Sequence, residues 1–414
     1  MKIAPGSPLE VSLCWGAGDT QHVGRLAYRD QLAYLEYTPE FLASGTELSP
    51  IRHRLSMKLE PAYQPHPFEG LHGVFNDSLP DGWGRLLVDR RAQQLGIEPA
   101  TLTPLDRLAC VGSNGIGALV YAPASDVWET SSQDLDLTEL AADARQVLEG
   151  DVSEVISILG QAGGSPGGAR PKALIGVDGH GHAVHGENDL PDGYAHYLVK
   201  FPGHGDPEDI AAIEMAYADM ATEAGVTMPT TKLLQGDSGA NYFATQRFDR
   251  DGSNRLHVHS ASGLLYADIR IPSLDYKDLI ALTRAVTRDH REVRKMYELA
   301  VFNVLAHNRD DHAKQFSFVM SRDGTWRLAP AYDLTWSQGP GGEHSTSLLG
   351  LGKDISREAL LKLGAVADLS PKVADQIIEI TTAAVSKWVQ FAERRGVGRK
   401  SKEEVRDAIG RVRV

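Results

Sequence analysis

The sequence predicts an α+β protein made of two or three packed units, and three observations lead to this class. The chain has 414 residues, whereas one domain usually holds about 100 to 200. Its first 125 residues or so mix strand-like and helix-like patterns. Its last part is mainly helical in pattern, interrupted by one short hairpin. We expect units at residues 1–125, 126–250 and 251–414, with a polar, acidic linker after the first.

Composition and charge restrict the function. The chain is 42% hydrophobic and 23% charged, which is ordinary for a globular protein and unlike a disordered chain or a coiled coil. Asp and Glu number 55 against 42 Lys and Arg, a net charge of −13. Such a surface repels a phosphate backbone. We therefore do not expect nucleic acid to be the primary ligand.

The sequence also indicates a cytoplasmic protein. Its two cysteines, Cys14 and Cys110, are too few for a disulfide framework and lack metal-ligand spacing, as is usual in a reducing compartment. The N-terminal MKIAPGSPLE lacks the apolar stretch of a signal peptide, and no run of about 18 apolar residues occurs. We expect neither export nor a membrane span.

Alternating apolar residues around polar turns predict the strands. Hairpins are expected where GRLAYRDQLAYLEY and FSFVMSRDGTWRLA occur. Single strands are expected at NGIGALVYAP, KALIGV and YAHYLVKFP.

Periodic apolar positions and end signals predict the helices. RLLVDRRAQQLG should be helical after the turn SLPDGWG. A second helix should begin with Asp206 as its cap and Pro207 in its first turn, and should close at Gly225. The clearest periodicity runs from about Arg291 to His307, where one apolar stripe recurs at helical spacing. The polar RDDHAKQ then ends that helix.

Two carboxylates flank the predicted C-terminal hairpin, Asp310 before it and Asp333 after it. They should therefore lie near each other, where carboxylates can hold a metal and orient a hydroxyl. Phosphoryl transfer needs such groups together with cations. Asp310 and Gln315 are five residues apart, the offset of the Asp and Asn in the catalytic loop of protein kinases. The alternative is that RDDH is a solvated helix cap.

Lys200 and Glu214 suggest an ion pair beside a nucleotide. Lys200 ends an apolar strand, where a lysine is costly to bury unless it meets an anion. Glu214 falls on the apolar stripe of the next helix. In kinases such a pair holds the lysine against the nucleotide phosphates. Alternatively, Glu214 lies partly exposed at the margin of the stripe.

The glycine-rich segment GGSPGGARPK could bring backbone amides close to phosphate, with Lys172 at its end as a point charge. It does not match the P-loop pattern. Residues 163–167 do fit G-x-S-x-G, the nucleophile elbow of serine hydrolases. That elbow needs a strand before it and a helix after it, which is the reverse of the order expected here. The segment could also be a flexible connector.

Taken together, these segments resemble the HipA-type serine/threonine kinases, the toxins of bacterial type II toxin-antitoxin systems. The resemblance covers almost the whole chain and rests on six motifs in family order. They are FNDSLPDG, SPGGARPKA, YLVKFP, TQRFDR, NRDDHAKQFSF and APAYDL.

The resemblance implies a bilobal, protein-kinase-like core in which residues 126–250 form the N-lobe and residues 251–414 the helical C-lobe, preceded by a HipA-type N-terminal α/β subdomain. It implies ATP and Mg²⁺ as cofactors. By resemblance, Asp310 is the catalytic residue, Gln315 and Asp333 are the magnesium ligands, and Ser165 is the site of autophosphorylation. The resemblance also implies a set of nucleotide-binding residues: Lys172, Lys200, Glu214, Gly167, Gly168, Gln246, Phe248 and Asp249.

In this family, phosphorylation of the loop serine moves the loop outward and disables nucleotide binding, which added negative charge beside phosphates explains. The family's substrates include aminoacyl-tRNA synthetases. The usual partner is a small helix-turn-helix antitoxin, through which the toxin meets DNA indirectly. The acidic balance of this chain fits that division, because the antitoxin would bring the positive charge.

The sequence departs from the family pattern at three positions. Gln315 stands where the family usually has asparagine, and its extra methylene requires the side chain to fold back or the loop to shift before the metal is reached. Pro171 removes a backbone donor from the phosphate loop. Gln246 replaces a glutamate in the adenine-pocket motif, a mild change. We predict an active kinase, with a catalytically impaired nucleotide-binding scaffold as the alternative.

Overall fold

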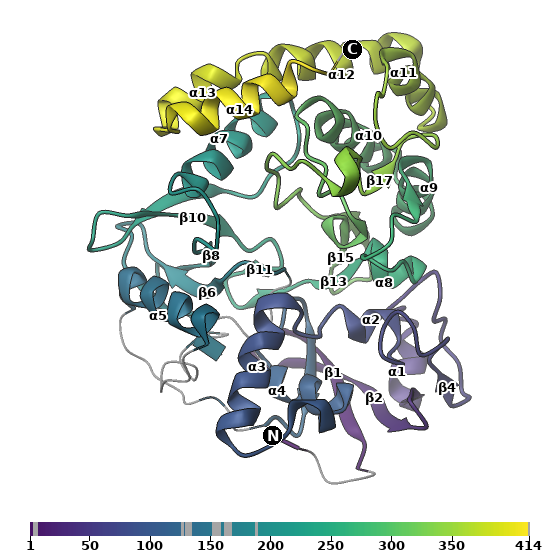
Figure 1. The fold of residues 1–414 in the computed structure, drawn as a ribbon. Coiled ribbons are helices and arrows are strands. Elements are labelled where there is room, and N and C mark those ends of the chain that lie inside the picture. The colour runs from purple at the N-terminus through teal and green to yellow at the C-terminus, as the bar shows by residue number, and fades with distance from the viewer. Residues whose placement is uncertain are drawn as a thin grey trace. The chain divides into compact units, whose positions relative to one another are not determined.

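The structure is a computed structural model that describes residues 1–2, 7–125, 128, 135–150, 159–160, 168–186 and 189–412. It contains both helices and sheets (Figure 1), so the α+β class is confirmed. The described chain packs into two compact units. Unit 1 comprises residues 1–206, 232–258 and 320–324, and unit 2 comprises residues 207–231, 259–319 and 325–414. The three domains expected from the sequence, with boundaries near residues 125 and 250, remain a prediction.

Unit 1 contains two five-stranded sheets and most of the short elements. Its elements are β1 (Leu9–Gly16), β2 (Asp19–Arg29), β3 (Leu32–Tyr37), α1 (Pro39–Ser44), β4 (Glu60–Pro61), α2 (Gly73–Asn76), α3 (Gly82–Gln94), η1 (Pro99–Thr101), α4 (Pro104–Val111), β5 (Leu119–Ala122), α5 (Leu137–Glu149), β6 (Lys172–Val177), β7 (Ala183–His185), β8 (Ala195–Lys200), β9 (Thr231–Gln235), β10 (Asn241–Gln246), β11 (Arg250–Asp251) and β12 (Asn254–Arg255).

The first sheet has the strand order β4-β3-β2-β1-β5. The predicted hairpin is confirmed as β2 and β3, which pair antiparallel. Its turn residues, Asp30 and Gln31, both have positive φ, 51° and 62°, as a two-residue turn that matches strand twist requires. The expected strand before Pro123 is also confirmed, as β5 beside β1.

The second sheet has the order β7-β6-β8-β10-β9, and its two faces differ. Side chains alternate between the faces of a strand. One face, with Ala173, Ile175 and Val199, belongs to a hydrophobic cluster that α3 and α5 help to form; Figure 1 shows α5 beside β6 and β8. The residues between them, including Lys172 and Lys200, therefore point to the other face.

A buried ionic cluster ties the segment after β10 to the loop before β5, within unit 1. Asp249, 1% exposed, accepts hydrogen bonds from Arg247 Nε at 3.0 Å and Arg250 Nη1 at 2.6 Å, and from Gly117 N at 2.7 Å. Both arginines also donate to the carbonyl of Gly115. Burial acts to raise the pKa of Asp249, but the two guanidinium groups outweigh it and hold that pKa well below its usual range.

Unit 2 is mainly helical. Its elements are α7 (Ile210–Glu223), α8 (Ala261–Leu265), β14 (Leu274–Asp275), α9 (Tyr276–Thr287), α10 (His290–Leu305), η2 (Ala313–Gln315), β15 (Ser317–Met320), β16 (Trp326–Leu328), η3 (Pro340–Gly342), β17 (Thr346–Ser347), α11 (Arg357–Val366), α12 (Pro371–Val385), α13 (Trp388–Arg395) and α14 (Arg399–Ile409). β13 (His257–Ser260) joins β15 and β16 in a three-stranded sheet.

The long helix predicted between Arg291 and His307 is confirmed as α10. The helix predicted to start at Asp206 begins instead at Ile210, with Asp209 at its cap position. The reason is local, because the Asp206 carboxylate accepts from Gly203 N at 2.8 Å and pairs with Arg170 at 3.0 Å, so it is not available as a cap.

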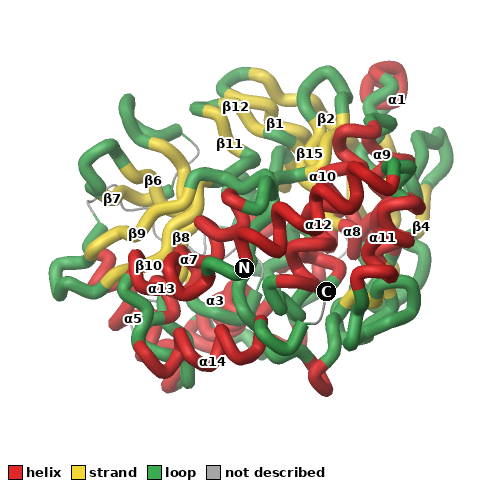
Figure 2. The backbone as a smooth tube through the Cα atoms, turned by 90° about the horizontal axis from the view of Figure 1, so that it is seen from above, coloured by secondary structure: helices red, strands yellow, loops and turns green. Residues whose placement is uncertain are grey.

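The C-terminal helices pack on α7 and α10 within unit 2. Figure 2 shows α13 beside α7 and α12 beside α10. Arg395 forms a two-point ion pair with Asp219 of α7, with distances of 2.6 and 2.9 Å. Asp209 accepts from Gly398 N at 2.7 Å and from Ser401 Oγ at 2.9 Å. These contacts fix α7, which carries Glu214. Of the helices that the structure describes, none is long and apolar enough to cross a membrane.

Replacing Asp249 with alanine should strongly destabilise unit 1. The change leaves Arg247 and Arg250 as buried charges without their carboxylate, which costs roughly 3 to 5 kcal/mol. Urea unfolding followed by circular dichroism measures it. Asp30→Asn is the matched control, because Asp30 pairs with Arg29 while both side chains are about four-fifths exposed (79% and 84%). Equal unfolding midpoints for the two variants would contradict a structural role for the cluster.

Candidate active site

The acidic loop after α10 contains one buried and one exposed aspartate. Asp311 is completely buried, whereas Asp310 is exposed. The buried face of α10 includes a polar residue, Asn303, 2% exposed. Its side-chain oxygen accepts from Asn308 Nδ2 at 2.9 Å, and its Nδ2 donates to Tyr276 Oη at 3.0 Å. The end of α10 and the start of the loop are thus joined through side chains.

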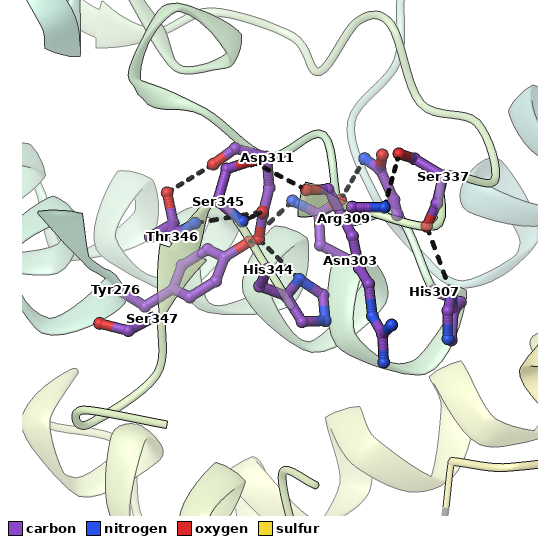
Figure 3. A network of polar contacts seen from close by, with 12 residues as sticks. Tyr276, Asn303, His307, Arg309, Asp311, Ser337, His344, Ser345, Thr346 and Ser347 are labelled. Atoms are coloured by element: carbon purple, nitrogen blue, oxygen red, sulfur yellow. Dashed lines mark hydrogen bonds and ion pairs between the residues drawn. The ribbon is translucent and has the colours of Figure 1, made fainter. Parts of the chain in front are cut away.

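The Asp311 carboxylate is the centre of this network (Figure 3). It accepts from Tyr276 Oη at 2.6 Å, Ser345 N at 2.8 Å and Thr346 N at 3.2 Å. His344 Nδ1 lies 2.9 Å from Asp311 Oδ2. Burial and the neighbouring carboxylate raise the pKa of Tyr276 well above its ordinary value, so this phenol remains a donor. Asp311 therefore fixes the loop that begins with Asp310.

A second aspartate holds the other end of the segment that Asp311 binds. Asp275 accepts from Ser347 Oγ at 2.9 Å, Leu349 N at 3.1 Å and Gly350 N at 2.7 Å. Burial acts to raise the pKa of Asp275, but hydrogen bonds from Lys277 N and Gly350 N outweigh it, and the pKa is lowered. Residues 344–350 are thus held at both ends by carboxylates, which order a stretch with little regular structure.

Gln315 and Asp333 lie together in unit 2. Gln315 Nε2 donates to Asp333 Oδ2 at 2.9 Å, and both side chains are partly exposed. Asp333 has a φ of 57°, in the left-handed region that non-glycine residues seldom adopt. Such strain is held only where the surrounding structure compensates for it. The hairpin of β15 and β16 therefore brings Asp333 to Gln315. The expected proximity of Asp333 to Asp310 remains a prediction.

This pair fits magnesium by its chemistry. Mg²⁺ prefers oxygen ligands and is usually bound through one or two protein groups, with waters and substrate phosphates completing the site. Asp333 supplies a carboxylate and Gln315 an amide oxygen. The amide now turns its nitrogen toward Asp333, so a half-turn of the amide would present the oxygen, a motion about a soft terminal torsion. Among the described residues, no cluster of three or more His, Cys, Asp or Glu side chains could hold a metal by itself.

Lys172 and Lys200 lie together in unit 1. They are directly opposite each other on the antiparallel strands β6 and β8, and Lys200 is in turn opposite Phe243 on β10. Directly opposed residues point to the same face of a sheet. Lys200 Nζ lies 5.5 Å from the centre of the Phe243 ring, and Lys172 is 5% exposed. Two lysine side chains therefore stand in one row on this face of the sheet.

The other predicted nucleotide-binding residues lie on several segments. Gln246 ends β10 and is opposite Tyr197, and Phe248 follows with partial exposure. Asp249 is the buried carboxylate of the ionic cluster, with both oxygens engaged by arginines. Glu214 is buried on α7 in unit 2, 3% exposed, so its placement on the apolar stripe rather than at its margin is confirmed.

Two predicted residues of the glycine-rich segment, Ser165 and Gly167, lie outside the described residues, as does the whole G-x-S-x-G match at 163–167. Gly168 is described and has a φ of 102°. A side chain there would lie 2.4 Å from Lys172 Nζ, a flexible group that could move aside. The positive φ, which side chains rarely adopt, is what favours glycine at this position.

The residues that support the acidic loop were not predicted from the sequence. Asp311, Tyr276 and His344 were not singled out, because nothing in the letters DD tells which carboxylate is buried. Asn303 did give a signal that could have been used. It falls on the otherwise apolar stripe of α10, three residues after Ala300, and a polar side chain at such a position usually has a specific partner.

The fold and the paired groups define a class, a two-unit α+β protein with a lysine pair in one unit and an acid-and-amide pair in the other. Comparison with known proteins gives the family. The profile described as HipA-like C-terminal domain matches residues 164–389, more than half of the chain, and the HipA N-terminal domain matches residues 17–122. The chain belongs to the HipA family, so the resemblance inferred from its motifs is confirmed.

Two individual proteins are also similar. A curated protein of Sinorhizobium fredii (strain NBRC 101917 / NGR234), named "Putative kinase Y4mE", is 27% identical over 380 residues, which cover 83% of this chain and 77% of that protein. The solved HipA of Shewanella oneidensis MR-1, in complex with HipB and operator DNA, covers 97% of this chain and 94% of its own, with a TM-score of 0.69 and 16% identity. At this identity the likeness concerns the fold.

Asparagine at position 311 should destabilise the protein, whereas asparagine at position 310 should not. Asp311→Asn presents amide hydrogens to donors such as Tyr276 and Ser345 in a buried site, which costs about 2 to 5 kcal/mol. Asp310→Asn removes an exposed carboxylate and should change stability by less than about 0.5 kcal/mol. Thermal unfolding of the two neighbouring variants compares them directly. The reverse order of midpoints would contradict the network in Figure 3.

Proposed function

We propose that this protein is a HipA-type serine/threonine protein kinase that transfers the γ-phosphate of ATP to a protein hydroxyl, with Mg²⁺ as its metal. Membership of the HipA family supports this proposal, as does the similarity to a protein of Sinorhizobium fredii whose name describes a kinase. The structural observation that carries it is the pair formed by Lys172 and Lys200.

The lysine pair suits a polyphosphate. The two lysines are directly opposed on one face of the sheet, so one bound polyanion can meet both ammonium groups. A nucleotide offers this charge together with an apolar base. In the proposed site, the lysines bind the phosphates, Glu214 is a further nucleotide-binding residue by resemblance, and Gly167 and Gly168 let the backbone approach. Gln246 and Phe248 complete the nucleotide-binding segment, and Asp249 supports this segment through the buried ionic cluster.

The acidic loop supplies the groups for transfer. Asp310 is exposed and is held by the buried Asp311 beside it, so it can orient a substrate hydroxyl and accept its proton. Gln315 and Asp333 would hold Mg²⁺, which would neutralise the charge that develops on the transferred phosphoryl group. The division between a structural and a reactive aspartate explains why two consecutive carboxylates are present.

We further propose that the protein is the toxin of a toxin-antitoxin pair. The Shewanella oneidensis protein of the same fold was solved with HipB and operator DNA, which suggests a helix-turn-helix antitoxin as the partner here. With a net charge of −13, this chain would reach DNA through that partner. An aminoacyl-tRNA synthetase is a candidate substrate, and Ser165 is a candidate site of autophosphorylation.

The proposed activity is tested by incubating the purified protein with ATP and Mg²⁺ and measuring added phosphate by mass spectrometry. We expect phosphate on Ser165 or on an added protein substrate. Asp310→Asn should reduce transfer by about a hundredfold or more, since it removes the proposed base. ATP binding should remain, because Asp310 does not hold the phosphates.

The matched control for this variant is Asp323→Asn, which removes an exposed carboxylate at the turn between β15 and β16. It should leave transfer unchanged. If Asp310→Asn transfers phosphate as fast as the unmodified protein, the assignment of the base is wrong. If neither protein binds ATP, the kinase proposal itself fails.

A second candidate function is favoured by Gln315. Its side chain is one methylene longer than the asparagine usual in the family. The protein could then bind nucleotide and antitoxin without efficient transfer and act as a regulatory scaffold. This alternative keeps the lysine pair and its ligand but removes the chemical step.

Gln315→Asn distinguishes the two functions. If Gln315 impairs metal binding, the shorter amide should raise the transfer rate by about tenfold or more, with little change in ATP affinity. Phosphate transfer and nucleotide binding are measured on both proteins. Gln390→Asn, an exposed position on α13, is the control for the substitution itself. Equal transfer rates before and after Gln315→Asn would refute the scaffold.

A further inference from the structure

The turn before α3 contacts the end of the glycine-rich segment, far along the chain. Gly168 N donates to Asp81 Oδ1 at 2.6 Å, and Trp83 N donates to Gly168 O at 2.9 Å. Both polar groups of the Gly168 backbone are therefore held by one turn, residues 81–83. These residues belong to the motif FNDSLPDG and the tryptophan that follows it, to which neither the sequence nor the proposed reaction gives a role.

Asp81 is a helix cap whose side chain is used elsewhere. It occupies the N-cap position of α3, yet its side chain makes no capping hydrogen bond. An aspartate at this position normally accepts from the second or third amide of its helix, a contact worth about 1 kcal/mol. Here α3 forgoes that contact and the carboxylate meets Gly168 N. The Asp81 side chain thus binds a residue distant in sequence instead of an amide of its own helix, which indicates that it positions that residue.

Gly82 permits the close approach. Its φ is 44°, and a side chain there would lie 2.4 Å from Gly168 O and 2.9 Å from Ala169 Cα. Contacts below 3.0 Å with backbone atoms cannot be relieved without moving the chain. The turn and the segment are thus packed backbone against backbone, and only glycine fits at position 82.

Trp83 extends the contact to the lysine that the segment leads into. Its ring is buried, 1% exposed, and Nε1 donates to Lys172 O at 3.1 Å. A side chain on Gly168 would lie 2.4 Å from Lys172 Nζ, so this ammonium group lies over Gly168. Asp81, Gly82 and Trp83 therefore fix Gly168, the backbone of Lys172 and the space that its ammonium group occupies.

We propose that the turn 81–83 is a positioning element for the nucleotide phosphates. It holds Gly168 and Lys172 where a phosphate would meet both, so part of the nucleotide site is built by the segment matching the HipA N-terminal domain. Asp81 and Gly82 are positioning residues, since neither is assigned a contact with the substrate. The inference rests on the proposed ATP-binding function.

A positioning role has a kinetic signature. The turn arranges groups that bind the nucleotide before transfer, so its loss should weaken ATP binding and raise KM while kcat changes little. The opposite role is also physically conceivable, because a carboxylate beside a phosphate site repels the ligand. In that case removing the charge would strengthen ATP binding. The two roles thus predict shifts of opposite sign.

The first test compares Asp81→Ala with Asp81→Asn in the full-length protein, with ATP affinity measured by isothermal titration calorimetry. The alanine loses the acceptor for Gly168 N, and ATP should bind about tenfold more weakly. Asparagine keeps an oxygen that accepts the same hydrogen bond, so it should restore affinity to within about threefold of the unmodified protein. Tighter binding in both variants would overturn the proposal.

The second test uses two glycines at positive φ. Gly82→Ala brings a methyl group against Gly168 O, and ATP affinity should fall by tenfold or more. Gly96→Ala, just after the other end of α3, has a φ of 69° and no heavy atom within 4 Å of the added methyl group. It carries similar backbone strain without the contact, and its ATP affinity should be unchanged. Equal losses in both variants would overturn the proposal.

Hydrogen exchange separates this proposal from the kinase function. In Asp81→Ala the Gly168 amide should exchange at least tenfold faster, because its acceptor is gone, whether or not ATP is present. If the unmodified protein binds no ATP, the proposed function fails, whatever this exchange shows. If it binds ATP and the exchange at Gly168 and the affinity are both unchanged in Asp81→Ala, the turn has no positioning role.

Discussion

The buried carboxylate of Asp311 is the interaction on which the candidate site in unit 2 depends. A buried charge is tolerated only when hydrogen bonds satisfy it. Asp311 meets this condition through Tyr276, His344 and two backbone amides. Each donor comes from a segment distant in sequence, so satisfying one side chain brings α9, the acidic loop and residues 344–350 together. The backbone of the exposed Asp310 is held in place because the next residue, Asp311, is fixed by these hydrogen bonds.

The sequence was a good guide where one local pattern determines the structure. The stripe of α10 and the hairpin at Asp30 and Gln31 follow from periodicity and turn chemistry alone, and both are present. The predicted start of α7 was wrong, because the aspartate of an Asp-Pro pair caps a helix only when no other donor binds its carboxylate. Gly203 and Arg170 do so here, and contacts of that kind cannot be read from a helical pattern.

The candidate site shows the same limit more sharply. Motif order led to Lys172, Lys200, Gln315 and Asp333, and the structure has Lys172 opposite Lys200 and Gln315 beside Asp333. The pairs expected from the sequence, Lys200 with Glu214 and Asp310 with Asp333, remain predictions. What the sequence could not give is which carboxylate is structural. In the pair of aspartates at 310 and 311, burial decides the role, and burial is a property of the whole fold. For that reason Asp311, with its donors, was found only in the structure.

Two of the residues proposed to act in function break a local rule. Asp333 adopts a left-handed conformation, and Asp81 makes no side-chain capping bond to its own helix. Each exception costs stability where it occurs, and sequences normally avoid such conflicts. The lost capping bond of Asp81 is replaced by its hydrogen bond from Gly168 N, which orders the Gly168 backbone beside Lys172. The N-terminal part of the chain therefore acts on the proposed phosphate site through a single turn.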